Sequence, residues 1–267
     1  MQLAVRHPNA AWTAFPSLVV RERNLELRLA AGPGDVRAAQ RLRFDVFNVE
    51  MRLGLSTSFA SGLDVDPYDD HCDHLLVLDR DLGGKVVGTY RLLPWDRTPS
   101  YGYYSESEFH LDAVRHSGMK LLELGRSCVA PEYRSGRVIN LLLRGIAEYA
   151  AECGADALMG CASIHGDGVA HARRVSEFLL EEFPAPPGLR VLPRRGFDLP
   201  APPAAGAGLL GGDALFRTLP PLFKGYLRLG ARVCGPPAYD RQFGTVDFFV
   251  LLDSRKLGDR YRRRFCR

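Results

Sequence analysis

The chain has 267 residues, of which 46% are apolar and 25% are charged, as in an ordinary soluble globular protein. No apolar run reaches the roughly 18 residues that a membrane span requires. The first residues, MQLAVRHPNAAWTAF, lack the basic start and continuous apolar core of a signal peptide, so we expect a cytoplasmic protein.

Charge is unevenly distributed along the chain. The net charge of +4 combines 35 Lys and Arg with 31 Asp and Glu, and the basic excess lies after residue 183. Such asymmetry indicates an anionic partner for the C-terminal part, although a solvated basic face explains it equally well. None of the six cysteines forms a Cys-x-x-Cys pair, so a zinc or redox motif is not expected.

Periodicity predicts an α/β arrangement around one mixed sheet flanked by helices. Asp35 is the expected cap of a helix that runs through Arg52. The other expected elements are strands at 25–30, 74–79, 85–93, 121–129, 155–164 and 244–253, with helices after residue 137 and at 169–183. The turn RDLGG joins the second and third strands as a hairpin.

The strand at 121–129 carries two charges that a buried strand should not tolerate, Glu123 and Arg126. Residues three apart in a regular strand face opposite sides, but a bulge at Gly125 would turn both toward one side. A bulge also exposes backbone N–H groups that can stabilise an oxyanion. A structural ion pair is the alternative reading of the two charges.

Three further regions hold candidate binding residues. Arg43, Phe47 and Glu50 share one face of the first helix, a pattern that a solvated edge also produces. Asp66 and Asp69 belong to an acidic loop, SGLDVDPYDDHCD, that suits a cationic substrate; calcium is an alternative, but the EF-hand spacing is absent. Arg91 lies inside a strand, which indicates a carboxylate or phosphate ligand.

The turn formed by Arg134, Ser135, Gly136 and Arg137 separates the strand at 121–129 from an apolar helix. The first N–H groups of a helix lack internal partners and favour anions, so this turn predicts a phosphate site.

The C-terminal part contains Lys224, Arg228 and Arg232, spaced four apart in the amphipathic stretch PPLFKGYLRLGARV. An anionic membrane or an acidic protein would suit this stretch, as would an ordinary surface helix. We expect a lead-in at 1–24, a core at 25–183, a Pro- and Gly-rich crossover or lid at 184–212, and a basic C-terminal part at 213–267 that completes the domain.

Several long motifs in one order resemble the ornithine N-acyltransferases that begin ornithine-lipid synthesis. They are GLDVDPYDDHCDHLLVLD, VVGTYRLLP, YYSESEF, LELGRSCVAPEYRSG, LMGCAS and the late segment LPPLFKGYLRLGARV…FGTVDFFVLLD. The resemblance spans roughly residues 35 to 255 and implies a GNAT-like acyltransferase fold with a basic C-terminal extension. The charged pattern is also distantly similar to that of acyl-homoserine-lactone synthases. The turn RSGRVI departs from the usual GNAT cofactor loop at its last glycine position.

The resemblance implies transfer of a 3-hydroxyacyl group from acyl carrier protein to the α-amine of ornithine, with no metal and no permanently bound cofactor. Glu123 is then the first choice as base, Glu50 the second, and the backbone near Gly125 the oxyanion site. Arg91 or Arg126 would hold the substrate carboxylate, and Asp66, Asp69 or Glu50 its side-chain ammonium; Arg43 and Phe47 complete the substrate pattern. The turn from Arg134 to Arg137 would bind the phosphopantetheine phosphate.

Two alternatives to this reading differ in chemistry. A related enzyme would use glycine or lysine as acceptor, or make a lactone from S-adenosylmethionine. A non-enzymatic protein would act directly on membranes, although its buried polar residues would then have no purpose. Nucleic acid is not expected as a partner, whereas peripheral contact with an anionic membrane is.

Overall fold

The computed structural model describes residues 18–54, 56–165, 168–200, 211–241 and 243–254. Most of the expected lead-in, part of the Pro- and Gly-rich segment and the basic tail lie outside these ranges. The chain divides into two compact units, each built from two stretches. Unit 1 comprises Met1–Tyr101 with Leu122–Ala155, and unit 2 comprises Gly102–Leu121 with Asp156–Arg267. The expected boundaries at residues 24, 183 and 212 stay a prediction.

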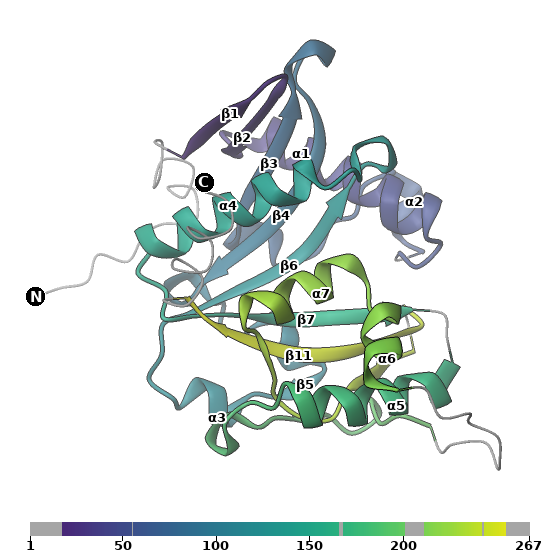
Figure 1. Cartoon of the computed structure of the whole chain (residues 1–267). Coiled ribbons are helices and arrows are strands. Elements are labelled where there is room, and N and C mark those ends of the chain that lie inside the picture. Colours follow the sequence, from purple (N-terminus) through teal and green to yellow (C-terminus); the bar gives the residue numbers. More distant parts are fainter. Residues whose placement is uncertain (1–17, 55, 166–167, 201–210, 242, 255–267) are drawn as a thin grey trace, which may run out of the picture. The chain divides into compact units, whose positions relative to one another are not determined.

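Unit 1 is built on an antiparallel sheet of five strands (Figure 1). Its order is β1 (Val19–Glu22), β2 (Leu25–Leu29), β3 (Asp73–Asp79), β4 (Lys85–Pro94) and β6 (Leu121–Val129). The hairpin expected between residues 79 and 85 is confirmed, with η4 (Arg80–Leu82) and two left-handed glycines in the turn. All seven residues of β3 are buried, because both faces of the sheet are covered.

Helices α1 (Pro33–Phe44) and α4 (Arg137–Glu152) lie on opposite faces of this sheet (Figure 1). Two glycines let α4 approach its face closely. A Cβ on Gly145 would lie 2.8 Å from Leu27 Cδ2, and one on Gly88 would clash with Val138 Cγ1. Side chains alternate along a strand, so the two helices contact different residues of β3.

The prediction that Asp35 caps the first helix is wrong. The helix begins at Pro33 after Gly32, and no side chain caps it. Asp35 lies inside the first turn and binds Arg28 instead, with Oδ1 3.0 Å from Nη2. Past Phe44 the helix continues as a π-helical turn, η2 (Asp45–Glu50), whose pattern includes Met51 N donating to Val46 O at 2.9 Å.

Short elements complete unit 1. They are α2 (Ser58–Ser61), η3 (Asp69–His71), η5 (Trp95–Arg97) and η7 (Pro131–Tyr133). Among them, η3 contains Asp69 and η7 precedes the turn at residues 134–137, so both position candidate site residues.

Unit 2 contains the long antiparallel pair β7 (Ala157–His165) and β11 (Thr245–Asp253), with β10 (Ala238–Asp240) and β9 (Arg232–Val233) paired to β11. Both long strands were expected from the sequence. A second, two-stranded sheet joins β5 (Phe109–His110) to β8 (Leu192–Pro193).

Helices α5 (Gly168–Glu182), α6 (Gly212–Thr218) and α7 (Pro221–Leu229) bury apolar side chains with the long strands of unit 2. Their shared core includes Val175, Leu179, Phe223 and Phe248. The other elements are α3 (Asp112–Arg115), η6 (Tyr104–Ser107) and η8 (Pro187–Leu189). Within the described ranges, no helix combines the length and apolar character needed to cross a membrane.

Candidate active site

Arg43 is the most completely buried charged residue of unit 1, with an exposed fraction of 0%. It lies in the last turn of α1 and is one of the buried residues of that helix. Its Nη1 donates to Asp69 Oδ1 at 2.9 Å and its Nη2 to Asp69 Oδ2 at 2.8 Å. Nη2 also contacts Asp64, through Oδ1 at 3.1 Å and through the backbone carbonyl. Two carboxylates from the acidic loop therefore neutralise one buried guanidinium.

Arg91 brings a second guanidinium from β4 to the same carboxylates. Its Nη1 donates to Asp66 Oδ1 at 2.6 Å and to Asp69 Oδ1 at 3.1 Å. The guanidinium carbon lies 5.6 Å from the centre of the Tyr68 ring, a cation–π distance. Burial, followed by the charges of Glu123 and Asp66, raises the pKa of Tyr68 far above its ordinary value, so its phenol stays protonated.

Arg126 is the third arginine of this group and comes from a bulge in β6. Arg91 pairs with Gly125 and Thr89 with Cys128, so Arg126 and Ser127 both lie opposite Tyr90. The expected bulge is confirmed, but Arg126 rather than Gly125 takes the left-handed conformation, with φ 51°. Such a φ is strained for a residue with a side chain. It directs Nη2 to 3.0 Å from Asp66 Oδ2 and Nε to 3.5 Å from Asp64 Oδ1.

Three arginines and three aspartates of unit 1 are joined by ion pairs, so their charges balance. We call this set the ion network; its members are Arg43, Arg91, Arg126, Asp64, Asp66 and Asp69. Burial alone would raise the pKa of both Asp66 and Asp69, but the arginines hold both below the ordinary range. Both carboxylates therefore stay ionised at neutral pH.

Glu123 adds one further carboxylate beside the ion network. It is 4% exposed, lies opposite Leu93 in the sheet, and its charge acts on both Tyr68 and Cys72. Glu123 and Arg126 thus both act on the acidic loop, Glu123 on Tyr68 and Arg126 on Asp64 and Asp66. A buried carboxylate next to a balanced network is suited to accept a proton.

Glu50 and Arg134 form a separate, exposed pair. Arg134 Nη1 and Nη2 lie 2.5 and 2.7 Å from the two carboxylate oxygens of Glu50. The hydrogen bonds from Arg134 lower the pKa of Glu50, so this carboxylate stays ionised; its role as second base stays a prediction. The pair instead ties η2 to the turn that precedes α4.

That turn has the geometry expected from the sequence. Gly136 precedes α4 with a left-handed φ of 99°, and Arg137 is the first helical residue. Ser135 and Arg137 are exposed beside the free N–H groups of the helix start. Phe47 lies in η2, half-buried, and its carbonyl accepts from Leu53 N and Gly54 N, which closes the loop after η2.

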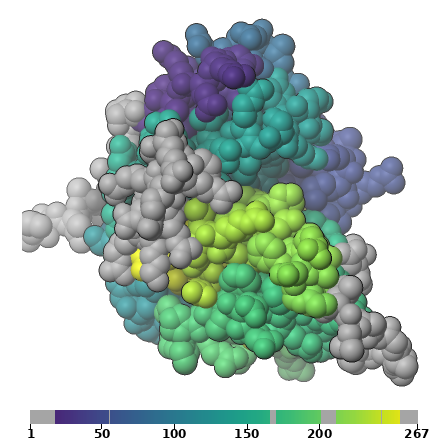
Figure 2. All heavy atoms as spheres, in the orientation of Figure 1, coloured from purple at the N-terminus to yellow at the C-terminus, as the bar shows by residue number. Residues whose placement is uncertain are grey.

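The expected basic stretch is only partly one surface. Lys224 and Arg228 lie on α7, which is at the surface of unit 2 in Figure 2. Arg232 does not share their helical face, because Gly230 ends α7 in a left-handed conformation and Arg232 begins β9. Arg228 is exposed, and its guanidinium carbon lies 5.4 Å from the centre of the Phe216 ring.

Sequence reasoning did not identify three contributors to this site. Asp64 was visible in the acidic loop but not chosen, and Tyr68 lies in the same loop. Gln40, whose Nε2 donates to Asp69 Oδ2 at 2.9 Å, lies one helical turn before Arg43. A polar residue at that spacing on a helix face that becomes buried was the available signal.

Comparison with known proteins places this geometry in a family. A model described as an acetyltransferase (GNAT) domain matches residues 42–144, which include the whole ion network and Glu123. A protein of Brucella abortus (strain 2308) named L-ornithine N(alpha)-acyltransferase is 41% identical over 251 residues, covering 89% of this chain and 87% of that protein. Its namesake from Rhizobium meliloti (strain 1021) is 38% identical over 250 residues, covering 89% and 83%.

The chain belongs to the L-ornithine N(alpha)-acyltransferase family. It is an acyltransferase with a GNAT domain, as the sequence motifs predicted. The solved structure of FeeM, an N-acyl amino acid synthase from uncultured soil microbes, covers 88% of this chain and 93% of that chain, with a TM-score of 0.49 and 15% identity. That likeness is too distant to carry an argument about the acyltransferase site.

His74 and the aspartates of the ion network predict that the protein loses stability on acidification. Burial lowers the pKa of His74, whose Nε2 lies 3.2 Å from Asp69 O, below its ordinary 6.5. The folded state favours neutral His74, so this stability is present above pH 6.5 and is lost as the pH falls through the lower folded-state pKa. Asp66 and Asp69 act in the same direction below their ordinary 3.8. Each group contributes a slope of at most about 1.4 kcal/mol per pH unit.

Urea unfolding between pH 8 and pH 5 measures this slope. We expect His74→Gln to flatten it, while the exposed control His110→Gln leaves it unchanged. Burial also lowers the pKa of His165, so some slope remains in both variants. A slope in His74→Gln equal to that of the unsubstituted protein would contradict the assignment.

Proposed function

We propose that this enzyme transfers a 3-hydroxyacyl group from acyl carrier protein to the α-amine of L-ornithine. The product is an N-acyl-ornithine, the lyso form of ornithine lipid, and the reaction is the first step of that lipid's synthesis. The observation that carries the proposal is identity of 37–41% over about nine-tenths of the chain to four proteins named L-ornithine N(alpha)-acyltransferase. The buried charges of unit 1 supply groups suited to such an acceptor.

Proton removal is the first requirement, because the α-amine of an amino acid is protonated at neutral pH and cannot attack in that form. Glu123 takes this proton, directly or through a water. The amine nitrogen then attacks the thioester carbonyl, the carbon–sulfur bond breaks, and the phosphopantetheine thiol leaves with a proton. Backbone N–H groups released from the ladder at the bulge beside Gly125 stabilise the oxyanion of the intermediate.

The acceptor's charges match groups of the ion network. Arg126 is the arginine of the network with the largest exposed side-chain fraction, 13% against 4% for Arg91 and 1% for Arg43. Arg126 is therefore the first choice to bind the ornithine carboxylate, and Arg91 is the second choice. Asp66 Oδ2 has the ion-pair contact with Arg126 Nη2 at 3.0 Å, whereas both oxygens of Asp69 accept hydrogen bonds from the buried Gln40 and Arg43 side chains. Asp66 is thus the better acceptor for the side-chain ammonium.

The acyl donor is assigned to two basic features. Ser135, Gly136 and Arg137 at the start of α4 bind the phosphopantetheine phosphate, while Arg134 holds the turn through Glu50. Lys224 and Arg228 on α7, with Arg232 on β9, meet the acidic carrier protein or an anionic membrane that receives the product. We propose a cytoplasmic enzyme with peripheral contact at the inner face of the cell membrane.

Mass spectrometry of the products tests the reaction as a whole. The protein is incubated with 3-hydroxyacyl carrier protein and isotopically labelled L-ornithine, and we expect a labelled N-acyl-ornithine. Parallel reactions contain glycine, lysine or S-adenosylmethionine as acceptor, and others replace the carrier protein with coenzyme A. If a product forms only with another amine, the protein is still an acyltransferase, but ornithine is not its acceptor.

Glu123→Gln tests the base. Since the amide cannot accept the proton, we expect turnover to fall by roughly 10²- to 10⁴-fold. Circular dichroism and the unfolding midpoint check that the variant is folded. Glu22→Gln, the same change at an exposed position of β1, is the matched control and should retain turnover. Near-normal turnover in Glu123→Gln would remove Glu123 as base.

Arg137→Ala tests the phosphate site. Loss of one charge-assisted contact should raise the KM for the acyl donor by roughly tenfold, with the KM for ornithine unchanged. Arg144→Ala, on the exposed side of the same helix, is the control. An equal rise in both KM values would argue against phosphate binding at this turn.

A further inference from the structure

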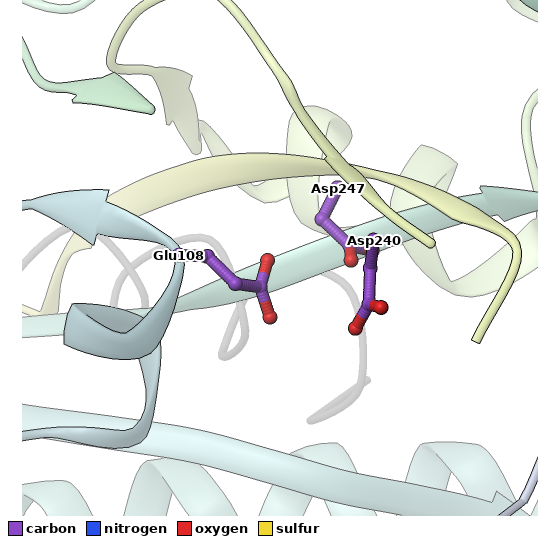
Figure 3. A group of neighbouring side chains, drawn as sticks. All are labelled: Glu108, Asp240 and Asp247. Carbon is purple, nitrogen blue, oxygen red and sulfur yellow. The ribbon is translucent and has the colours of Figure 1, made fainter. Parts of the chain in front are cut away.

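A second group of buried acids lies in unit 2, apart from any residue used above. Glu108 follows η6, Asp240 ends β10, and Asp247 is the third residue of β11. Their exposed fractions are 3%, 8% and 4%, and one oxygen of each lies within 4.8 Å of the others. Figure 3 shows the three side chains converging from separate segments of the chain.

Two of these carboxylates have oxygens without a hydrogen-bond partner. Asp247 Oδ2 accepts from Thr245 Oγ1 at 2.9 Å, and Asp240 Oδ1 accepts from Phe243 N at 3.1 Å. Glu108 Oε2 and Asp247 Oδ1 are buried and accept no hydrogen bond from the described residues. A buried polar atom without a partner is costly, and a buried charge without one more so.

The carboxylates of Glu108 and Asp247 differ in their charge partners from those of the ion network of unit 1. Neither Glu108 nor Asp247 forms an ion pair with a described Lys, Arg or His. A cation among the three carboxylates would supply the opposite charge that Glu108 and Asp247 do not receive from any described basic side chain.

We propose that Glu108, Asp240 and Asp247 bind a hard divalent cation, and that Ca²⁺ fits better than Mg²⁺. Carboxylate oxygens are the ligands that both ions prefer. Mg²⁺ usually keeps several waters and is bound by only one or two carboxylates, in a strict octahedral geometry. Ca²⁺ accepts more carboxylate ligands in a more flexible geometry. Three buried carboxylates from separate segments therefore suit the larger ion better.

Such an ion joins three segments of unit 2 that are far apart in the sequence. It contacts the residue before β5, the end of β10 and the start of β11. The unpartnered oxygens of Glu108 and Asp247 become its ligands, which removes their desolvation cost. The role of the ion is to stabilise unit 2, and the acyl transfer proposed above needs no step through it.

The test uses the full-length protein after treatment with a chelator and dialysis. Thermal unfolding is followed while CaCl₂, MgCl₂ or ionic-strength-matched KCl is added, and calorimetric titration gives the stoichiometry. We expect one Ca²⁺ per chain and a rise in Tm on the order of 5 °C at a hundredfold excess over Kd. Mg²⁺ should act more weakly and KCl not at all.

Variants locate the effect. Glu108→Gln and Asp247→Asn each remove one charge at nearly constant shape and should abolish both the Tm rise and the calorimetric signal. Glu177→Gln, the same change on the exposed side of α5, should keep both. The titration of the unsubstituted protein decides the matter even where a variant does not fold.

Three results would overturn the proposal. They are no binding of either cation, a Ca²⁺ effect of equal size in Glu108→Gln, and stabilisation by L-ornithine or putrescine, but not by metal, that Glu108→Gln abolishes. The last result would make this group a site for an organic ammonium.

Discussion

The enclosed guanidinium of Arg43 is the interaction on which unit 1 depends. It binds Asp64 and Asp69, and through Asp69 it is coupled to Arg91 and Gln40. Desolvating such charges costs several kcal/mol per ion, so burial is tolerated only because each has an opposite partner. Removing one partner would leave a buried charge without an opposite charge beside it. The acidic loop, which has little regular structure of its own, is held to the sheet by these contacts.

The same arrangement explains why the bulge in β6 persists. Arg126 occupies a left-handed conformation that costs on the order of 1–3 kcal/mol for a non-glycine residue. Its contacts with Asp64 and Asp66 offset that strain. In a regular strand, Arg126 would face away from Glu123. The ion pairs of Arg126 and the bulge of β6 therefore depend on one another.

Sequence patterns anticipated the strands and the bulge because charge inside an apolar strand is rare and requires an explanation. The same signal was present at Asp247, in GTVDFFVLLD, but Glu108 and Asp240 are far from it in sequence, and only the fold joins them. Predictions from helix capping and helical spacing failed where another contact or the end of a helix determined the position of the residue. Asp35 binds Arg28 instead of capping α1, and Gly230 separates Arg232 from the face of α7. The pairing of Glu50 with Arg134 spans 84 positions and has no local signature.

The π-helical turn η2 has a consequence for how the family can vary in length here. A π-helical segment contains one residue more than the α-helix that it interrupts, and it rotates everything after it by about 100°. Arg43 lies before this turn and Glu50 at its end, so the extra residue sets the angle between the two side chains. Loss of a single residue from 45–50 would restore a regular helix and swing Glu50 away from Arg134. Members of the family should therefore tolerate substitutions in this segment far better than deletions.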